Sequence, residues 1–247
     1  MKILPNIPGV IKLIYCLKYF NERKKPIEEA RVRGDYEEER KYIKEAENIW
    51  GPMVLKYFGS TLTIHGEENI PEEGPIVIVA NHQGYCDIPA LFATFKNMAI
   101  AFVAKKELRS LPIYGVWIER IRSVFMDRED SREALKTIKA GIDNLNNGFS
   151  MVIFPEGTRS KGGEPGEFMK GPLKLATKPG VPIVPVSIEG TYKMFEEKGT
   201  FSPADIHVMV NEQIPTAGIS RQEEKELNDR VEKIIKDGVK KLQGEEI

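Results

Sequence analysis

The sequence of 247 residues predicts an α/β fold, with a mixed, largely parallel sheet flanked by helices. Short apolar, β-branched runs alternate with longer segments in which apolar residues recur at helical spacing, which is the pattern of this fold class. The run at 75–80 is continuously apolar, which indicates a strand buried on both faces. Several runs end in polar, reactive side chains, and buried sheets of this class place their ligands at the carboxyl ends of strands.

Residues 1–58 are predicted to form an N-terminal two-helix segment, and residues 59–247 an α/β domain. The first helix covers 7–20, and a charged second segment runs to residue 57, with a weak point at Gly34 and a kink at 51–52. The first helix carries an apolar stripe with lysines around it, formed by Ile7, Val10, Ile11, Ile14 and Leu17. Such a helix suits a membrane interface with anionic headgroups, and packing on the domain's own core explains the same pattern equally well.

The remaining elements follow from the same patterns in chain order. Strands are predicted at 61–65, 75–80, 98–104, 123–126, 151–154, 181–186 and 205–210. Helices are predicted from Asp87, from Asp130 to about 147, over 174–178 and from Ser220 to about 242, and the segment 112–121 is expected to be helical or irregular. Capping boxes at the starts of two of these helices support the assignment, since a Glu stands three residues after each cap.

Composition narrows the range of functions. A formal net charge of -1 gives no general case for nucleic-acid binding, so any site for an anion must be local. The two cysteines, Cys16 and Cys86, make no disulfide framework, and no cysteine–histidine cluster has zinc spacing. No uninterrupted apolar run approaches the ~20 residues that span a bilayer. These features favour a reducing, cytoplasm-facing location.

The candidate catalytic residues surround the strand at 75–80. His82 follows this strand directly, and Asp87 stands at the start of the next helix, as a favoured cap residue. A carboxylate bonded to one imidazole nitrogen fixes the tautomer and leaves the other nitrogen free to accept a proton. The pair alone is weak support for catalysis, because His and Asp fall at this spacing by chance in many chains.

Other predicted strands end in polar residues of the same kind. Lys105 and Arg128 follow two of them, and a third opens into the run from Glu156 through Gly157 and Thr158 to Arg159. The arginines offer planar forks for a phosphate or carboxylate, and a glycine lets the backbone approach an anion closely. We therefore expect an anion-binding site beside His82.

These motifs resemble those of the glycerolipid acyltransferase family. The resemblance rests on 81–87 for the first motif, 154–160 for the third, 168–171 for the segment after it and 181–186 for the fourth. In the second motif Phe125 and Arg128 fit the family's pattern, whereas Arg122 stands where the family has glycine.

The resemblance implies a fatty acyl transfer to the sn-2 hydroxyl of lysophosphatidic acid, with acyl-CoA or acyl carrier protein as donor. By resemblance, His82 is the general base and Asp87 orients it and stabilises the imidazolium. Substrate binding falls to Glu156, Gly157, Thr158, Arg159 and Arg128, and Lys105 is a further candidate for phosphate binding or oxyanion stabilisation. No metal, nucleotide or flavin is implied. The expected partner surface is a phospholipid membrane, with the enzyme on the cytoplasmic face of the cell membrane.

Three alternatives stay open at the level of sequence. The same chemistry serves other acceptors, such as glycerol 3-phosphate or another lysophospholipid. A thioesterase uses water in place of the hydroxyl, and a non-catalytic lipid-binding protein needs no base. Cys86 lies between His82 and Asp87 and suggests an acylated cysteine, but direct transfer needs no covalent intermediate.

Overall fold

The centre of the molecule is a sheet whose strands follow the order β1-β7-β6-β2-β5-β3-β4 in the described part of the chain. The structure is a computed structural model that describes residues 6–127, 131–169 and 171–244. Its strands are β1 (Thr61–His65), β2 (Val77–Ala80), β3 (Ile100–Lys105), β4 (Val124–Met126), β5 (Ser150–Ile153), β6 (Ile183–Glu189) and β7 (Asp205–Val210). Neighbouring strands pair in parallel, except β6 with β7, which are antiparallel. The predicted mixed, largely parallel sheet is confirmed.

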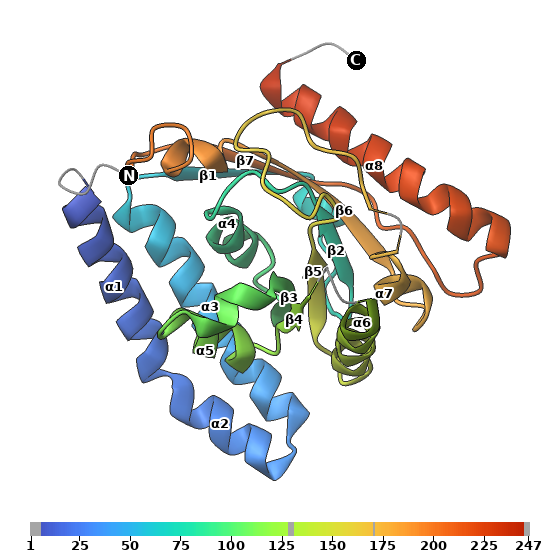
Figure 1. Cartoon of the computed structure of the whole chain (residues 1–247), viewed down its shortest axis with the longest axis horizontal. Coiled ribbons are helices and arrows are strands. Elements are labelled where there is room, and N and C mark those ends of the chain that lie inside the picture. Colours follow the sequence, from blue (N-terminus) through green and yellow to red (C-terminus); the bar gives the residue numbers. More distant parts are fainter. Residues whose placement is uncertain (1–5, 128–130, 170, 245–247) are drawn as a thin grey trace.

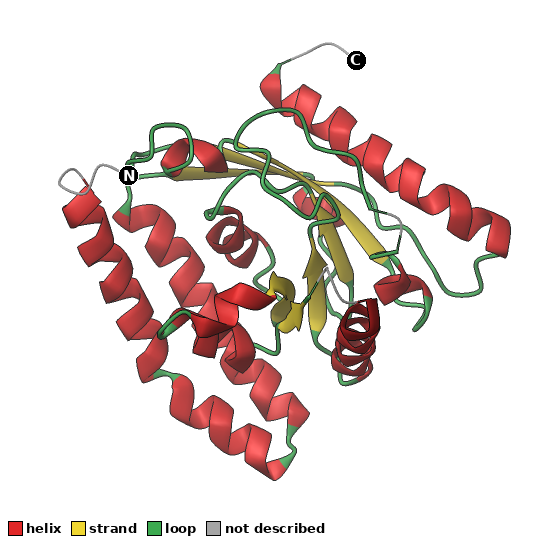
Figure 2. Ribbon diagram, in the orientation of Figure 1, coloured by secondary structure: helices red, strands yellow, loops and turns green. Residues whose placement is uncertain are grey.

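Helices cover both faces of this sheet (Figure 1). One face carries α1 (Ile7–Glu22), α2 (Lys24–Arg33), α3 (Tyr36–Tyr57), α4 (Asp87–Thr94) and α5 (Tyr114–Arg120). The other face carries α6 (Ser131–Asn146), α7 (Lys174–Thr177) and α8 (Arg221–Gln243). Figure 2 shows the strands enclosed between these two groups of helices.

The central strand β2 shows why this arrangement forms. All four of its residues are buried, and their side chains alternate between the two faces. Ile78 and Ala80 belong to the apolar cluster beneath the N-terminal helices, whereas Val77 and Val79 belong to the cluster beneath the other helices. The continuous apolar run therefore fills two cores at once.

The N-terminal helices share their core with the sheet. Cys16 and Phe20 of α1 and Trp50 of α3 lie in the same apolar cluster as the β2 side chains. The helix α3 approaches α4 closely at Gly51, where a Cβ atom would lie 2.7 Å from the Cβ of Phe92. The domain division at residue 58 stays a prediction, since the apolar cluster crosses it.

The expected second helix is divided at Gly34, which ends α2 in a left-handed conformation with φ +70°. Asp35 then caps α3 by accepting a hydrogen bond from the backbone N–H of Glu38 at 3.0 Å. At the other end of the chain, the predicted capping box of Ser220 and Glu223 is present at the start of α8. The predicted cap Asp130 lies outside the described residues.

The backbone at Arg122 takes a conformation typical of glycine, the residue that the family's second motif has at this position. Its φ of +64° lies in the left-handed region, which glycine occupies without strain and other residues do not. Its guanidinium makes two hydrogen bonds to the buried carboxylate of Glu39, of 2.8 and 2.6 Å. This bidentate ion pair with α3 holds an arginine in a conformation that favours glycine.

Candidate active site

His82 and Asp87 are in direct contact at the carboxyl end of β2. The Nδ1 of His82 lies 2.6 Å from Oδ2 of Asp87. The Asp87 side chain is fully buried, while that of His82 keeps 21% of its surface exposed. The ring of His82 stacks on Phe154, with centroids 4.1 Å apart and planes 15° apart. The imidazole is therefore fixed at Nδ1 and on one ring face, which leaves Nε2 for a substrate.

Asp87 acts as a hydrogen-bond acceptor for the loop before it, not as a helix cap. Cys86 occupies the N-cap position, and Asp87 is the first residue of α4. Oδ2 of Asp87 accepts backbone hydrogen bonds from Gln83 at 2.8 Å and Gly84 at 3.0 Å, in addition to the contact with His82. Oδ1 accepts a hydrogen bond from the hydroxyl of Thr191. A buried carboxylate is stable only when its oxygens are paired in this way.

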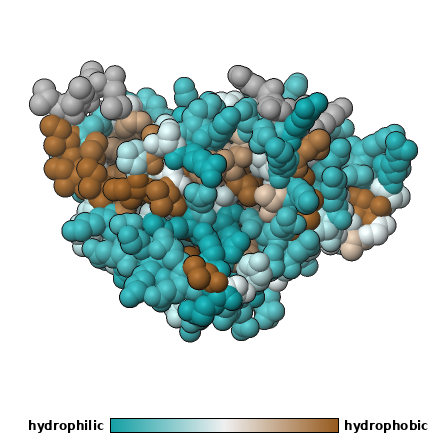
Figure 3. Space-filling view, turned by 60° about the horizontal axis from the view of Figure 1, so that its bottom comes forward, coloured by the Kyte–Doolittle hydropathy of each residue, from teal (hydrophilic) through white to brown (hydrophobic). Residues whose placement is uncertain are grey.

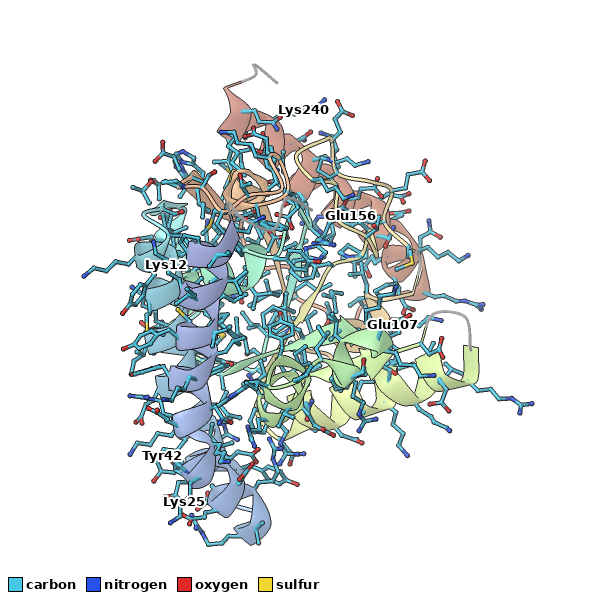
Figure 4. The ribbon with its side chains drawn as sticks, turned by 60° about the vertical axis from the view of Figure 1, so that its left-hand side comes forward. Lys12, Lys25, Tyr42, Glu107, Glu156 and Lys240 are labelled. Carbon is cyan, nitrogen blue, oxygen red and sulfur yellow. The ribbon has the colours of Figure 1, made fainter. Side chains whose placement is uncertain are left out.

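Glu156 connects the His82 loop to the loop after β5. Its Oε1 accepts a 2.7 Å hydrogen bond from the backbone N–H of His82, and its Oε2 accepts one of 2.7 Å from Gly166. Burial raises the pKa of the Glu156 carboxyl, and the two backbone donors act against that rise. Figure 4 labels Glu156 inside the outline of the molecule, to the right of α1 in that view. The carboxylate therefore holds backbone in place with both of its oxygens.

Arg159 is held by Glu196, a residue that sequence reasoning missed. Its Nη1 donates a 2.9 Å hydrogen bond to Oε1 of Glu196, and its guanidinium lies 3.8 Å from the centroid of the Tyr85 ring. The same Oε1 accepts the backbone N–H of Tyr85 at 2.8 Å. Burial raises the pKa of the Glu196 carboxyl, against the lowering effect of the backbone N–H of Tyr85 and of Arg159.

A cavity of about 560 Å³ brings most of the predicted site residues together. His82, Lys105, Gly157, Thr158 and Arg159 line it, while Asp87 and Glu156 are not among its lining residues. Its other walls are mainly apolar and aromatic, and come from α1, α3, α4, α5 and β3; they include Leu17, Phe20, Trp50, Ile88, Phe92, Phe102, Trp117 and Ile118. The polar end with His82 therefore continues into an apolar interior.

The other predicted residues that line this cavity are Lys105, Gly157 and Thr158. Gly157 adopts φ +72°, a left-handed conformation that glycine accommodates in the loop after β5. Lys105 ends β3, with its Nζ 3.5 Å from a carboxylate oxygen of Glu107. Thr158 is exposed. Arg128 lies outside the described residues.

Cys86 does not have the surroundings of a nucleophile. Its side chain is buried, and it is not among the residues that line the cavity. Burial is the largest cause that raises the pKa of its thiol, and the nearby carboxylates of Glu196 and Asp87 raise it further. The thiol therefore stays protonated, which disfavours the acylated-cysteine alternative.

Thr191, Gln83 and Glu196 complete the site. Gln83 lies inside the first motif, at 81–87, where no sequence signal singled it out, and Thr191 and Glu196 lie outside the motifs. Thr191 and Glu196 follow β6 and reach the His82 loop only because the sheet places β6 beside β2. The fourth motif, at 181–186, ends shortly before Thr191 and is the one signal in the sequence that pointed to this region. Among the described residues, no group of His, Cys, Asp and Glu could hold a metal ion.

An acyltransferase family profile matches residues 61–189, which include β1 to β6 and the loops that carry His82 and Arg159. Taken with the fold and the site geometry, this match shows that the chain belongs to the acyltransferase family.

Named relatives make the family assignment more specific. The chain is 32% identical over 178 residues to "1-acyl-sn-glycerol-3-phosphate acyltransferase BAT2, chloroplastic" of Brassica napus, which covers 71% of this chain and 51% of the relative. It is 31% identical over 187 residues to the 1-acyl-sn-glycerol-3-phosphate acyltransferase of Borreliella burgdorferi, which covers 75% of this chain and 73% of the relative. The aligned region thus spans only about half the length of the plant relatives.

A solved structure matches nearly the whole chain. It is the crystal structure of the 1-acyl-sn-glycerophosphate (LPA) acyltransferase, PlsC, from Thermotoga maritima. The two share 31% sequence identity with a TM-score of 0.73, and the match covers 98% of this chain and 100% of the other. The likeness therefore includes the N-terminal helices, which the family profile does not cover.

Proposed function

We propose that this protein transfers a fatty acyl group from acyl-CoA or acyl carrier protein to the sn-2 hydroxyl of lysophosphatidic acid, forming phosphatidic acid. The observation that carries the proposal is the contact of 2.6 Å between His82 and the buried Asp87 at the polar end of an apolar cavity. The names of the relatives support lysophosphatidic acid as the acceptor.

The proposed reaction is direct transfer. Nε2 of His82 removes the proton from the acceptor hydroxyl as its oxygen attacks the thioester carbonyl. Asp87 stabilises the positive charge that develops on the imidazole, because its carboxylate lies against Nδ1. When the tetrahedral intermediate collapses, the carbon–sulfur bond breaks and the thiolate takes the proton from His82. The scheme needs no metal, nucleotide or flavin.

The phosphate of the acceptor is proposed to lie between Arg159 and Lys105, which both line the cavity beside His82. Arg159 offers a bidentate fork, and Lys105 a mobile point charge that suits a phosphate or the developing oxyanion. Gly157 and Thr158 shape the backbone next to that phosphate, and Glu156 fixes this backbone to the His82 loop. Arg128 stays in the proposal as a second phosphate contact.

The fatty chain is proposed to occupy the apolar part of the cavity, and the membrane surface to meet α1. The outer face of α1 exposes a row of apolar side chains: Ile7, Val10, Ile11, Ile14 and Tyr15. Figure 3 shows a brown, hydrophobic strip along the left-hand side of the molecule, the side on which Figure 1 places α1. In Figure 4, Lys12 of α1 and Lys25 of α2 lie along the same edge, where cationic groups would meet anionic headgroups.

The described helices include none that is both long and apolar enough to cross a bilayer. A peripheral position on the cytoplasmic face of the cell membrane fits these features.

An acceptor panel tests the proposal. Purified protein is incubated with labelled palmitoyl-CoA or palmitoyl-acyl carrier protein in lipid vesicles, with lysophosphatidic acid, glycerol 3-phosphate or lysophosphatidylethanolamine as acceptor. We expect labelled phosphatidic acid from the first acceptor alone. Product from another acceptor would keep the chemistry and change the substrate, whereas free fatty acid in the presence of acceptor would indicate a thioesterase. No product with either donor would contradict the enzymatic function.

A further inference from the structure

The buried carboxylate of Asp87 is held asymmetrically. Its Oδ2 accepts three hydrogen bonds, from His82 and from two backbone N–H groups. Among the described residues, its Oδ1 accepts one, from the hydroxyl of Thr191. Asp87 and Thr191 are both fully buried, so water does not reach Oδ1 in place of that hydroxyl. Thr191 therefore supplies the hydrogen bond to the second oxygen of this carboxylate.

The turn at the end of β6 places Thr191 against Asp87. Gly190 adopts φ +92°, and a Cβ atom at this position would collide with the backbone carbonyl of Asp205. A glycine is therefore required where the chain turns back toward the His82 loop.

Gln83 and Glu189 fix the other side of this contact. The side-chain amide of Gln83 donates a 2.7 Å hydrogen bond to the carboxylate of Glu189, which turns its carbonyl oxygen toward Thr191 at 3.4 Å. The hydroxyl of Thr191 has a single hydrogen, and the charged, nearer acceptor Asp87 receives it. The hydroxyl of Thr191 therefore donates its hydrogen bond to the carboxylate of Asp87.

We propose that Thr191 is a positioning residue, whose hydroxyl holds Oδ1 of the Asp87 carboxylate and thereby sets how strongly Oδ2 pairs with His82. The effect on rate rests on the proposed function, and the effect on His82 itself does not. Without the hydroxyl, Oδ1 is buried without a donor, and the carboxylate becomes a stronger acceptor for the proton on Nδ1 of His82.

The direction of the effect follows from the charges around the dyad. The charged groups around it are Glu156, whose carboxylate accepts from the His82 backbone, the Glu196–Arg159 pair, and Glu189 behind Gln83. Lys105 and Glu107 line the same cavity as His82. Replacing Thr191 leaves all of them in place. A carboxylate that accepts one hydrogen bond fewer stabilises the protonated imidazole more strongly. His82 therefore changes protonation state at a higher pH, and the acidic limb of the kcat/KM profile moves to higher pH with it.

The experiment compares Thr191→Val, which has the same shape without the hydroxyl, with Thr191→Ser, which restores it, and with Thr191→Ala as a second variant without it. Thr94→Val is the matched control, because Thr94 is also buried, lies on the same helix as Asp87 and donates to the backbone of Ala90 instead. The chain has three histidines, so nuclear magnetic resonance of ¹⁵N-histidine-labelled protein follows each ring through a pH titration. His65 and His207 serve as internal references.

We expect the titration midpoint of His82 to rise by roughly half a pH unit in Thr191→Val and Thr191→Ala, and to stay near wild type in Thr191→Ser and Thr94→Val. We expect kcat to fall about tenfold in the same two variants, with little change in KM for the acceptor. A His82 midpoint in Thr191→Val equal to that in Thr94→Val would overturn the inference. A shifted midpoint in a protein without acyl transfer would support the positioning role and reject the proposed function.

Discussion

Asp87 shows how a single residue links the fold to the proposed chemistry. It begins α4, but its carboxylate turns back to accept two backbone N–H groups of the loop that carries His82. The loop is thereby held in a shape that presents the imidazole at the end of β2. The same carboxylate oxygen then contacts Nδ1 of His82. Removing this carboxylate would affect both the loop and the base.

At the same scale, Glu47 carries a prediction about stability. It is fully buried on α3, and its Oε2 accepts a 3.1 Å hydrogen bond from the backbone of Ile100. Burial raises its pKa well above the ordinary value of 4.5. Because the folded-state pKa is raised, the stabilising contribution of the protonated form is fully present below pH 4.5 and is lost as pH rises through the folded-state pKa.

We therefore expect Glu47→Gln to be more stable than wild type at pH 8, with a smaller difference at pH 5. The amide keeps an acceptor for Ile100 and carries no charge at either pH. Urea denaturation at the two pH values measures the difference, and Glu45→Gln is the control, since Glu45 lies exposed on the same helix. A gain in stability that is equal at both pH values would contradict a buried, charge-destabilised carboxyl.

At the scale of elements, α1 has two different faces. One face buries Cys16 and Phe20 in the core, and the opposite face exposes large apolar side chains. Four residues of the apolar stripe noted in the sequence, Ile7, Val10, Ile11 and Ile14, lie on the exposed face, so packing on the domain's own core does not account for them, and the membrane interface stays a prediction. Exposed isoleucines in a row on a helix are typical of a surface that meets a partner or a lipid interface.

We predict that Ile11→Glu combined with Ile14→Glu reduces binding to vesicles that contain anionic phospholipid by about tenfold or more, because two apolar side chains leave the lipid and two negative charges enter. Vesicle co-sedimentation measures the change. Leu135→Glu on α6 is the matched control, since Leu135 is 66% exposed and Ile11 is 61% exposed. Equal vesicle binding by the double variant and the control would show that α1 is not the membrane-binding surface.

At the scale of the whole molecule, the site depends on the polarity of the sheet. Strands β6, β2, β5, β3 and β4 run in parallel, so their carboxyl ends lie along one edge. His82 follows β2, Lys105 ends β3, and Arg159 follows β5 at this edge. The N-terminal helices complete the cavity from the side with Leu17, Phe20 and Trp50. The polar site and the apolar cavity thus come from different parts of the chain.

Much of this arrangement could be predicted from local sequence patterns. Continuous apolar runs, turn residues and caps identified the strands and most of the helices, and the motifs identified His82, Asp87 and the 156–159 run. The antiparallel pairing of β7 with β6 was not predictable, because pairing depends on contacts between distant segments. Thr191 and Glu196 were missed for the same reason, since each meets the His82 loop more than one hundred positions away.

The most direct test of the account is the rate of phosphatidic acid formation by three alanine variants, one for each histidine of the chain. His65 is on the edge strand β1 and His207 on β7, with Nε2 of His65 3.2 Å from Nδ1 of His207. Neither residue lines the cavity with His82. We predict that His82→Ala lowers kcat by about 10²–10⁴-fold, whereas His65→Ala and His207→Ala stay within a few fold of wild type. Activity in His82→Ala comparable to that of the other two variants would contradict the role of His82 as the base.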